Sequence, residues 1–289
     1  MEENTGFFKK KCFINCRGAL LDLSGPMIMG ILNLTPDSFY DGGKYKNEKD
    51  ALNQTGKMLE EGAGIIDIGA VSSRPGAEKI NPEEEQTRLL PHLRNIARKF
   101  PGAVLSVDTY NASTARAAVN EGAAIINDIS GGTMDKEMFE TIASLNVPYI
   151  LMHIQGTPQS MQKKPIYEDV FKAVSAFFSE RTDLLKRLGV NDIIIDPGFG
   201  FGKTVEHNYT LLNNLDKFRI FNLPVLAGLS RKSMICRVLD SKPEAALNGT
   251  TALNTIALLK GANILRVHDV KEAVEVMRIA AQMAGRREN

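Results

Sequence analysis

Short apolar runs rich in β-branched residues alternate along the chain with longer segments whose apolar positions recur at helical spacing. The short runs predict eight strands, at Met27–Asn33, Ile65–Ala70, Val104–Thr109, Ile125–Ser130, Pro148–His153, Ile193–Asp196, Pro224–Leu229 and Ile264–Asp269. A predicted helix follows each strand, at Lys49–Glu61, Pro82–Arg98, Ala112–Glu121, Lys136–Leu145, Glu168–Leu188, Val205–Phe218, Ala245–Leu259 and Lys271–Met283. The strand starts are about 34 residues apart on average, which is the length of one strand-plus-helix unit.

Several strand segments are continuously apolar, as in Ile193–Ile195 and Ala124–Ile126. Such runs are typical of parallel strands that are covered on both faces. Eight parallel units can close into a barrel or form an open doubly wound sheet, and the regular repeat favours closure. We therefore predict an α/β fold, a single-domain (β/α)8 TIM barrel over residues 27–289. Residues 1–26 form an N-terminal extension, in which Cys12–Leu23 is predicted to make a small hairpin at the barrel bottom.

Composition narrows the class of protein. Hydrophobic residues make up 43% of the chain and charged residues 24%, so a sizeable core can form. The 35 Lys and Arg nearly cancel the 34 Asp and Glu, so we expect neither nucleic acid nor an anionic membrane as a partner. Three cysteines cannot all pair, no apolar run reaches about 18 residues, and the start lacks a signal-peptide pattern. These features predict a cytoplasmic protein.

Polar residues gather where the predicted strands end. They are Asn33, Ser73, Arg74, Asp108, Asn127, Asp128, His153, Asp196, Ser230, Arg231, Lys232, Arg266, His268 and Asp269. In this barrel the carboxyl ends of the strands build the active site, although Asp, Asn and Ser also favour helix caps and turns. Asp108, Asn127 and Asp196 directly follow apolar strand residues, so they should be partly enclosed. Enclosed acceptors need donors, which predicts a ligand rich in N–H groups.

A basic corner is predicted at the last two strands. Period-two alternation places Arg266 and His268 on one face of their strand. With Lys232 and Arg231 from the preceding loop they would form the phosphate site usual for this architecture. Alternatively, Arg266 pairs structurally with Asp269 or with another barrel carboxylate.

Two kinds of loop complete the pattern. The glycine-rich segment 196–204 departs from both the P-loop and the dinucleotide fingerprint, so its glycines are expected to form a tight turn or to admit a flat ligand. Segments 33–43 and 71–77 have the composition of mobile lids, or of ordinary surface loops. His92 and His207 fall in helical patterns, and the absence of zinc-type spacing disfavours a zinc enzyme.

These motifs together resemble the dihydropteroate synthase family. The matching runs are Gly30–Phe39, Asp67–Gly69, Ser73–Gly76, Val107–Thr109, Ile126–Asp128, Met152–His153, Asp196–Phe201, Ser230–Ser233 and Leu265–Asp269. They stand in the family's order over roughly residues 27–284, nearly the whole chain. The resemblance implies that the protein condenses 6-hydroxymethyl-7,8-dihydropterin diphosphate with 4-aminobenzoate, releasing pyrophosphate, in folate biosynthesis.

The resemblance also assigns roles to residues. The pterin-binding residues would be Asp108, Asn127, Met152, Asp196, Lys232 and Arg266. Pyrophosphate would contact Asn33, Arg266 and His268, with Asn33 also binding Mg²⁺. The residues at 4-aminobenzoate would be Phe39, Ser73, Arg74, Pro75, Lys232 and Ser233. The catalytic set would be Asn33, Asp37, Lys232, Arg266 and His268.

The implied reaction is a largely dissociative displacement. Pyrophosphate leaves first, the cation delocalises into the pterin, and the arylamine then attacks, so no covalent enzyme nucleophile is needed. Asp37 would shield or stabilise the cation. One departure is Ser73, where many members carry Thr, which leaves the packing of that lid around the arylamine open. The family further implies inhibition by sulfonamides and a homodimer formed through helices near Ala252–Leu259 and Val274–Met283.

Two other functions remain open on sequence alone. A pterin-binding methyltransferase domain resembles this barrel, but it would work with a corrinoid partner and would need no pyrophosphate site. A non-enzymatic pterin-binding module would lack amine-dependent release of pyrophosphate. The Arg266–His268 pair and the first lid favour the synthase.

Overall fold

Eight parallel strands form the centre of the computed structural model, which describes residues 12–34, 48–71, 80–158, 160–161 and 165–283. The strands are β3 (Met27–Asn33), β4 (Ile65–Gly69), β5 (Val104–Asp108), β6 (Ile125–Asp128), β7 (Tyr149–Met152), β8 (Ile193–Asp196), β9 (Leu226–Ala227) and β10 (Ile264–Val267). Their order is β8-β7-β6-β5-β4-β3-β10-β9, and a parallel bridge between Ile195 and Val225 joins the two ends. The predicted TIM barrel is confirmed, and the open doubly wound sheet is wrong.

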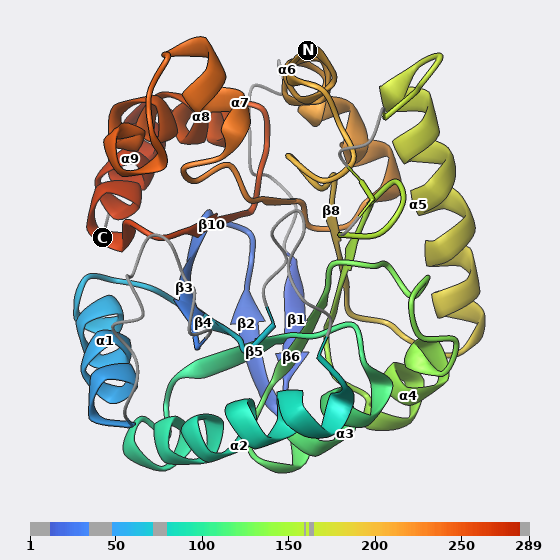
Figure 1. Ribbon diagram of the computed structural model, residues 1–289, viewed down its shortest axis with the longest axis vertical. Helices are drawn as coiled ribbons and strands as arrows, with labels where there is room; N and C mark the ends of the chain where they lie inside the picture. Colours follow the sequence, from blue (N-terminus) through green and yellow to red (C-terminus); the bar gives the residue numbers. More distant parts are fainter. Residues whose placement is uncertain (1–11, 35–47, 72–79, 159, 162–164, 284–289) are drawn as a thin grey trace, which may run out of the picture.

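Helices surround this barrel on the outside (Figure 1). They are α1 (Glu48–Glu60), α2 (Pro82–Lys99), α3 (Ala112–Asn120), α4 (Met138–Leu145), α5 (Val170–Arg187), α6 (Val205–Asn213), α7 (Ser233–Val238), α8 (Leu247–Leu259) and α9 (Val270–Met283). The start of α2 follows from its sequence, because the Asn81 side chain accepts the Glu84 N–H and Pro82 needs no N–H partner there. Among the described residues, no helix has the length and hydrophobicity that a membrane span requires.

Four elements differ from the sequence prediction. The predicted helix Val205–Phe218 is divided into α6 and the 3-10 helix η1 (Leu215–Phe221), and the short α7 was not predicted. A second 3-10 helix, η2 (Pro243–Ala245), precedes α8. The strand predicted at Pro224–Leu229 is reduced to β9. Pro224 has no N–H, and the Val225 N–H donates to the Asn263 side chain at 3.0 Å, so the backbone there lacks regular strand pairing.

An antiparallel hairpin, β1 (Phe13–Cys16) and β2 (Ala19–Asp22), precedes the barrel. Its turn residues Arg17 and Gly18 both have positive φ, 57° and 90°, as a tight hairpin turn requires. Ile14 and Cys16 pack in one buried cluster with the lower interior side chains of the barrel, including Ile65, Ile125, Ile194 and Ile264. The hairpin therefore closes the amino-terminal end of the barrel.

Candidate active site

A layer of functional side chains lies directly above the apolar floor of the barrel. The residue two positions after each floor residue points to the same strand face. This step leads from Ile65 to Asp67, from Ile125 to Asn127, from Ile150 to Met152, from Ile194 to Asp196 and from Ile264 to Arg266. Strand register aligns the rim further, since Asn33 pairs with Gly69, Gly69 with Asp108 and Asp108 with Asn127. The sequence-predicted rim residues are thus brought to one level.

Arg266 connects the carboxylates of this layer. Its Nε donates to Asp67 Oδ2 at 2.6 Å, and its Nη2 donates to Asp108 Oδ2 at 2.8 Å. Asn127 Nδ2 donates to the same Asp67 oxygen at 2.9 Å. The side chain of Asp67 is fully buried, and its other oxygen, Oδ1, has no hydrogen-bond partner among the described residues. The predicted alternative in which Arg266 pairs with a barrel carboxylate is therefore what the structure contains.

The sequence analysis did not assign Asp67 to the site. Its signal was nevertheless present, because Asp67 is a charged residue inside the apolar run Ile65–Ile68. A carboxylate inside such a strand must have donors, since burying it alone costs several kcal/mol, on the order of the effective penalty for a buried ion. Arg266 and Asn127 supply those donors.

Asp108 has a strongly perturbed acidity. Burial raises the pKa of its carboxyl group from 3.8 to about 7, against the positive charge of Arg266, which lowers it. The nearby carboxylates of Asp67, Glu85 and Asp128 also raise the pKa of Asp108. The protonation state of this rim residue therefore changes close to neutral pH.

Asp196 and Lys232 form the opposite side of the rim. Asp196 Oδ1 accepts the backbone N–H of Gly198 at 2.7 Å, and burial raises the pKa of Asp196 while Lys232 lowers it. Lys232 Nζ donates to the Phe199 carbonyl and lies 4.6 Å from the centroid of the Phe201 ring. Burial lowers the pKa of Lys232 to about 8, which keeps most of it charged at neutral pH.

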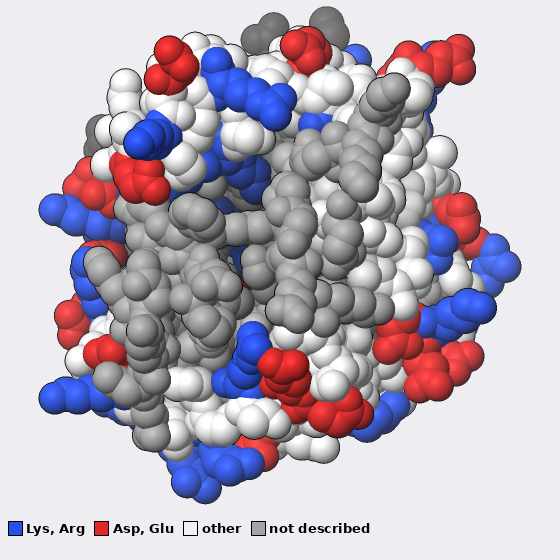
Figure 2. All heavy atoms as spheres, viewed as in Figure 1, with Lys and Arg blue, Asp and Glu red and all other residues white. Residues whose placement is uncertain are grey.

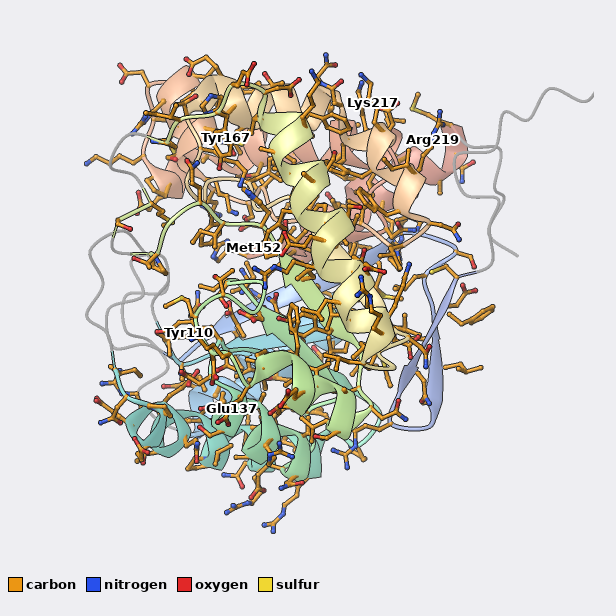
Figure 3. All side chains as sticks on the ribbon, turned by 90° about the vertical axis from the view of Figure 1, so that its right-hand side faces the viewer. Tyr110, Glu137, Met152, Tyr167, Lys217 and Arg219 are labelled. Carbon is orange, nitrogen blue, oxygen red and sulfur yellow. The ribbon has the colours of Figure 1, made fainter. Side chains whose placement is uncertain are left out.

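Met152 lies in a small apolar cluster with Tyr110, Ile129, Ile154 and Met161. The positions of Met152 and Tyr110 can be followed in Figure 3. The side chain of Met152 is 2% exposed, and strand register places Met152 beside Asp196. Phe201 packs on the edge of this cluster. A flat ligand at the rim would therefore meet an apolar surface beside the polar one.

His268 departs from the predicted basic corner. The Ser230 hydroxyl lies 3.0 Å from His268 Nδ1 and accepts the His268 backbone N–H at 3.3 Å. Burial, reinforced by the charge of Arg266, lowers the pKa of His268 to about 3. The imidazole is therefore neutral, so it can act as the donor predicted beside Arg266 but adds no positive charge there.

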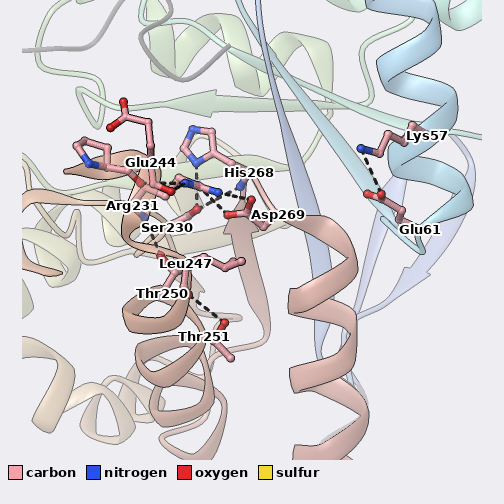
Figure 4. A network of polar contacts seen from close by, with 11 residues as sticks. Lys57, Glu61, Ser230, Arg231, Glu244, Leu247, Thr250, Thr251, His268 and Asp269 are labelled. Carbon is pink, nitrogen blue, oxygen red and sulfur yellow. Dashed lines mark hydrogen bonds and ion pairs between the residues drawn. The ribbon is translucent and has the colours of Figure 1, made fainter. Parts of the chain in front are cut away.

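Arg231 also departs from that prediction. Its guanidinium makes a bidentate ion pair with Asp269, with Nε 2.8 Å from Oδ2 and Nη2 2.6 Å from Oδ1 (Figure 4). It also donates to the backbone carbonyls of Pro243 and Glu244. The Arg231 side chain is only 6% exposed. Its backbone is left-handed, with φ 57°. Arg231 therefore fixes the loop that carries Ser230 and Lys232, and its guanidinium is engaged by Asp269 and the two carbonyls.

The remaining predicted residues divide into two groups. Asn33 ends β3 and is half-buried, and Ser233 begins α7 directly after Lys232. Five residues assigned to the lids lie outside the described part of the chain: Asp37, Phe39, Ser73, Arg74 and Pro75. Basic side chains are visible in the hollow at the centre of the face drawn in Figure 2.

Comparison with known proteins gives consistent results. A model of the family described as pterin binding enzyme matches residues 29–268. The chain is 45% identical over 275 residues to the dihydropteroate synthase of Escherichia coli (strain K12), with 94% of this chain and 97% of that protein covered. The enzyme of Haemophilus influenzae is 46% identical over 261 residues, with 90% and 94% covered.

Solved structures resemble the chain over a similar extent. Dihydropteroate synthase of Yersinia pestis in complex with a sulfonamide drug superposes with a TM-score of 0.92 at 42% identity, covering 95% of this chain and all of that one. The Thermus thermophilus enzyme in complex with 4-aminobenzoate superposes with a TM-score of 0.85 at 35% identity, covering 94% of this chain and all of that one.

Proposed function

The chain belongs to the dihydropteroate synthase family of pterin-binding enzymes, and on that premise we propose how its rim residues carry out the reaction. The enzyme transfers a pterinylmethyl group from 6-hydroxymethyl-7,8-dihydropterin diphosphate to 4-aminobenzoate, giving 7,8-dihydropteroate and pyrophosphate. The observation that carries the proposal is the convergence of Asp108, Asn127, Asp196, Lys232 and Arg266 on one barrel rim. These residues lie on five different strands or loops, so only the closed barrel brings them together.

We assign Asp108, Asn127 and Asp196 to the N–H-rich edge of the pterin. A carboxylate or amide oxygen accepts such donors, and a ligand edge that leaves a buried acceptor unpaired would lose affinity. Lys232 is a donor only and so fits an acceptor atom of the ring. Met152 provides the apolar surface beside the ring.

We assign the diphosphate to Arg266 and His268. Two of the five N–H donors of the Arg266 guanidinium bind Asp67 and Asp108, which orients the group toward the rim. His268 contributes a neutral N–H donor, held in place by Ser230. Such preorganised donors stabilise the charge that develops on the leaving pyrophosphate.

Magnesium is implied by the family, and the described residues fit it through one amide oxygen. Asn33 Oδ1 and Asp108 Cγ lie 3.8 and 3.9 Å from the point that a Cβ on Gly69 would occupy, so the amide faces the rim. Mg²⁺ is commonly held by one or two protein oxygens together with substrate phosphates and water. We propose Asn33 as that protein ligand. The bound ion would neutralise charge on the phosphate oxygens.

We propose that carbon–oxygen bond cleavage precedes attack by the arylamine. The electron pair of the broken bond stays with pyrophosphate, and the positive charge is delocalised into the pterin ring. The amine nitrogen then forms the new bond to the methylene carbon and loses a proton to solvent water. Ser233, next to Lys232, is assigned to the arylamine carboxylate, and Phe39, Ser73, Arg74 and Pro75 are assigned to the same substrate. Asp37 is assigned to shielding or stabilising the cation.

Pyrophosphate release tests the proposed reaction directly. The purified protein with pterin diphosphate, Mg²⁺ and 4-aminobenzoate is expected to release pyrophosphate in a strictly amine-dependent way, and a chelator should stop it. A sulfonamide should compete with 4-aminobenzoate. Pterin binding without pyrophosphate release would favour a non-enzymatic module, and methyl transfer to a corrinoid would favour the methyltransferase; either result would contradict the synthase.

Pterin binding should strengthen as pH rises through about 7. Asp108 is expected to accept pterin N–H groups as the carboxylate, and its pKa is raised to about 7, so acid converts it into the less suitable carboxylic acid. Calorimetry with the unphosphorylated pterin alcohol avoids the titration of the diphosphate. We expect the dissociation constant to fall between about pH 5.5 and 8 and then to level off. An Asp108→Asn variant should lose this dependence; a wild-type constant that does not change with pH would contradict the role of Asp108.

We also propose a cytoplasmic homodimer. Apolar side chains are exposed on the outer helices, with Ile279 and Met283 of α9 at 65% and 69% and Ile256 of α8 at 39%. Helices α8 and α9 pack side by side, so these residues form part of one region. Within the described part of the chain Cys12, Cys16 and Cys236 form no disulfide, which supports a reducing compartment. Sedimentation equilibrium should give twice the chain mass, and a monomer at micromolar concentration would contradict the dimer.

A further inference from the structure

The loop after β8, residues 197–204, has a conformation that few sequences can adopt. Gly198, Gly200 and Gly202 all have left-handed backbones, with φ of 70°, 81° and 60°. A Cβ on Gly198 would lie 2.0 Å from the His153 carbonyl oxygen, and one on Gly202 would lie 2.5 Å from the Gln155 carbonyl oxygen. The loop is therefore pressed against the segment after β7. Glycines permit this shape, but they do not select it, because each glycine has many other conformations open to it.

Lys203 ties the two segments together at one atom. Its Nζ lies 2.9 Å from the carbonyl oxygens of Gly198 and Phe201, 3.2 Å from the carbonyl oxygen of His153, and 3.0 Å from His153 Nδ1. The residue is 3% exposed, so these groups replace its water shell. One amino group thus closes the loop on itself and fastens it to the end of β7.

The charges around this contact are unusual. Burial lowers the pKa of Lys203 to about 7 and that of His153 to about 3, so the imidazole is neutral and its Nδ1 accepts from the amine. The His153 ring packs edge-on against Phe177, with centroids 5.1 Å apart. The hydrogen-bond partners of Lys203 are carbonyls and an imidazole, and the nearby charge of Asp196 raises its pKa against the effect of burial. A buried amine that bonds only neutral groups indicates a geometric demand at this point.

The same loop supplies three contacts to the pterin rim. The Gly198 N–H donates to Asp196, the Phe199 carbonyl accepts from Lys232, and the Phe201 ring lies against the Lys232 amino group. A shift of this loop would displace both Asp196 and Lys232. Resting on the function proposed above, we propose that Lys203 is a positioning residue for pterin recognition, acting through the 197–204 loop and His153.

A Lys203→Met variant tests this role, because Met retains most of the side-chain volume and removes the amine. We expect the dissociation constant of the unphosphorylated pterin alcohol, measured by calorimetry, to rise about 10- to 100-fold, the scale of a misplacement of about 1 Å. The KM for 4-aminobenzoate at saturating pterin diphosphate should rise by a clearly smaller factor, because Lys232 is the one displaced rim residue that is also assigned to 4-aminobenzoate. This split separates positioning of the pterin rim from a general loss of structure.

Thr182→Val is the matched control. Thr182 is also buried, and its hydroxyl donates to the Phe178 carbonyl at 2.7 Å within α5, away from the rim. The Thr182→Val substitution should lower the midpoint temperature of thermal unfolding without changing the dissociation constant of the pterin alcohol. If Lys203→Met does not fold, Lys203→Gln keeps an N–H donor and should give a smaller increase of the same kind. An unchanged pterin constant, or an equal change in Thr182→Val, would overturn the proposal. Failure of the wild type to bind the pterin would instead overturn the proposed function.

Discussion

An Asp196→Ala variant is expected to lose measurable pterin binding and to lower kcat/KM by at least about 10³-fold, as when a site loses the buried partner of a substrate N–H group. Asp196 is 6% exposed, ends β8 and faces the charge of Lys232. Removing the carboxylate leaves the pterin edge without its acceptor and Lys232 without the nearby negative charge that raises its pKa. Calorimetry with the pterin alcohol and pyrophosphate release at varied pterin diphosphate measure the two effects.

Asp192 provides a control at the opposite end of β8. It directly precedes β8 at the closed end of the barrel, where its side chain accepts the Asn15 backbone N–H at 3.0 Å. Asp192→Ala should therefore leave pterin affinity unchanged while loosening the hairpin. If Asp196→Ala binds the pterin as tightly as Asp192→Ala does, the assignment of Asp196 to the pterin edge is wrong.

An Arg266→Met variant is expected to lose both stability and activity. The substitution leaves Asp67 and Asp108 facing each other without their shared cation, and breaking a buried ion pair in this way costs about 3–5 kcal/mol. Loss of the donor to the leaving group should also lower kcat by about 10²-fold or more. Urea denaturation and pyrophosphate release measure the two losses separately.

The pH dependence of the stability loss identifies its cause. Asp108 has a raised pKa in the folded protein, so it stabilises the fold at acid pH, and that contribution fades as pH rises through about 7. Without Arg266 the pKa of Asp108 in the folded protein rises further, so the loss of its stabilising contribution continues to higher pH. The destabilisation relative to wild type should therefore be larger at about pH 8 than at about pH 5.5. An equal difference at both pH values would show that lost packing, and not the unpaired carboxylates, is responsible.

An exposed ion pair serves as the comparison. Arg88 pairs with Glu84 on the outside of α2, with side-chain exposures of 33% and 47%. Such surface pairs contribute roughly 0–1 kcal/mol. Arg88→Met should therefore change the free energy of unfolding only slightly, and about equally at the two pH values.

The sequence predicted the barrel fold and the position of the site at the carboxyl ends of the strands, because both depend on local patterns. Asp108, Asn127 and Asp196 were expected at the rim since each directly follows apolar strand residues, and the structure places them there. The two-residue step of a strand also placed Arg266 correctly on the inner face. These inferences need only the strand period and the direction of parallel strands.

The sequence did not reveal which charges pair. Arg266 meets Asp67 and Asp108, which lie 199 and 158 residues away, and Arg231 meets Asp269, which lies 38 residues away. These partners are set by the register of neighbouring strands and by the left-handed turn at Arg231. The burial of Lys203 was equally hidden, because its neighbours in sequence suggest an ordinary loop. Local patterns place a side chain on a face, whereas its partner depends on distant chain segments.

The closure of the barrel has a consequence for how the protein holds its substrate. Among the described residues, β8 meets the segment before β9 through one bridge, Ile195 to Val225, whereas β7 and β8 are paired over four residues. The boundary between β8 and β9 is therefore weakly paired, and Asp196 and Lys232 lie on opposite sides of it. A pterin that binds both side chains would hold the two sides of this boundary together. Separation of β8 from β9 and release of the ligand are therefore thermodynamically linked. A bound pterin should protect the backbone amides of β8 and β9 against hydrogen exchange more than those of the distant β4.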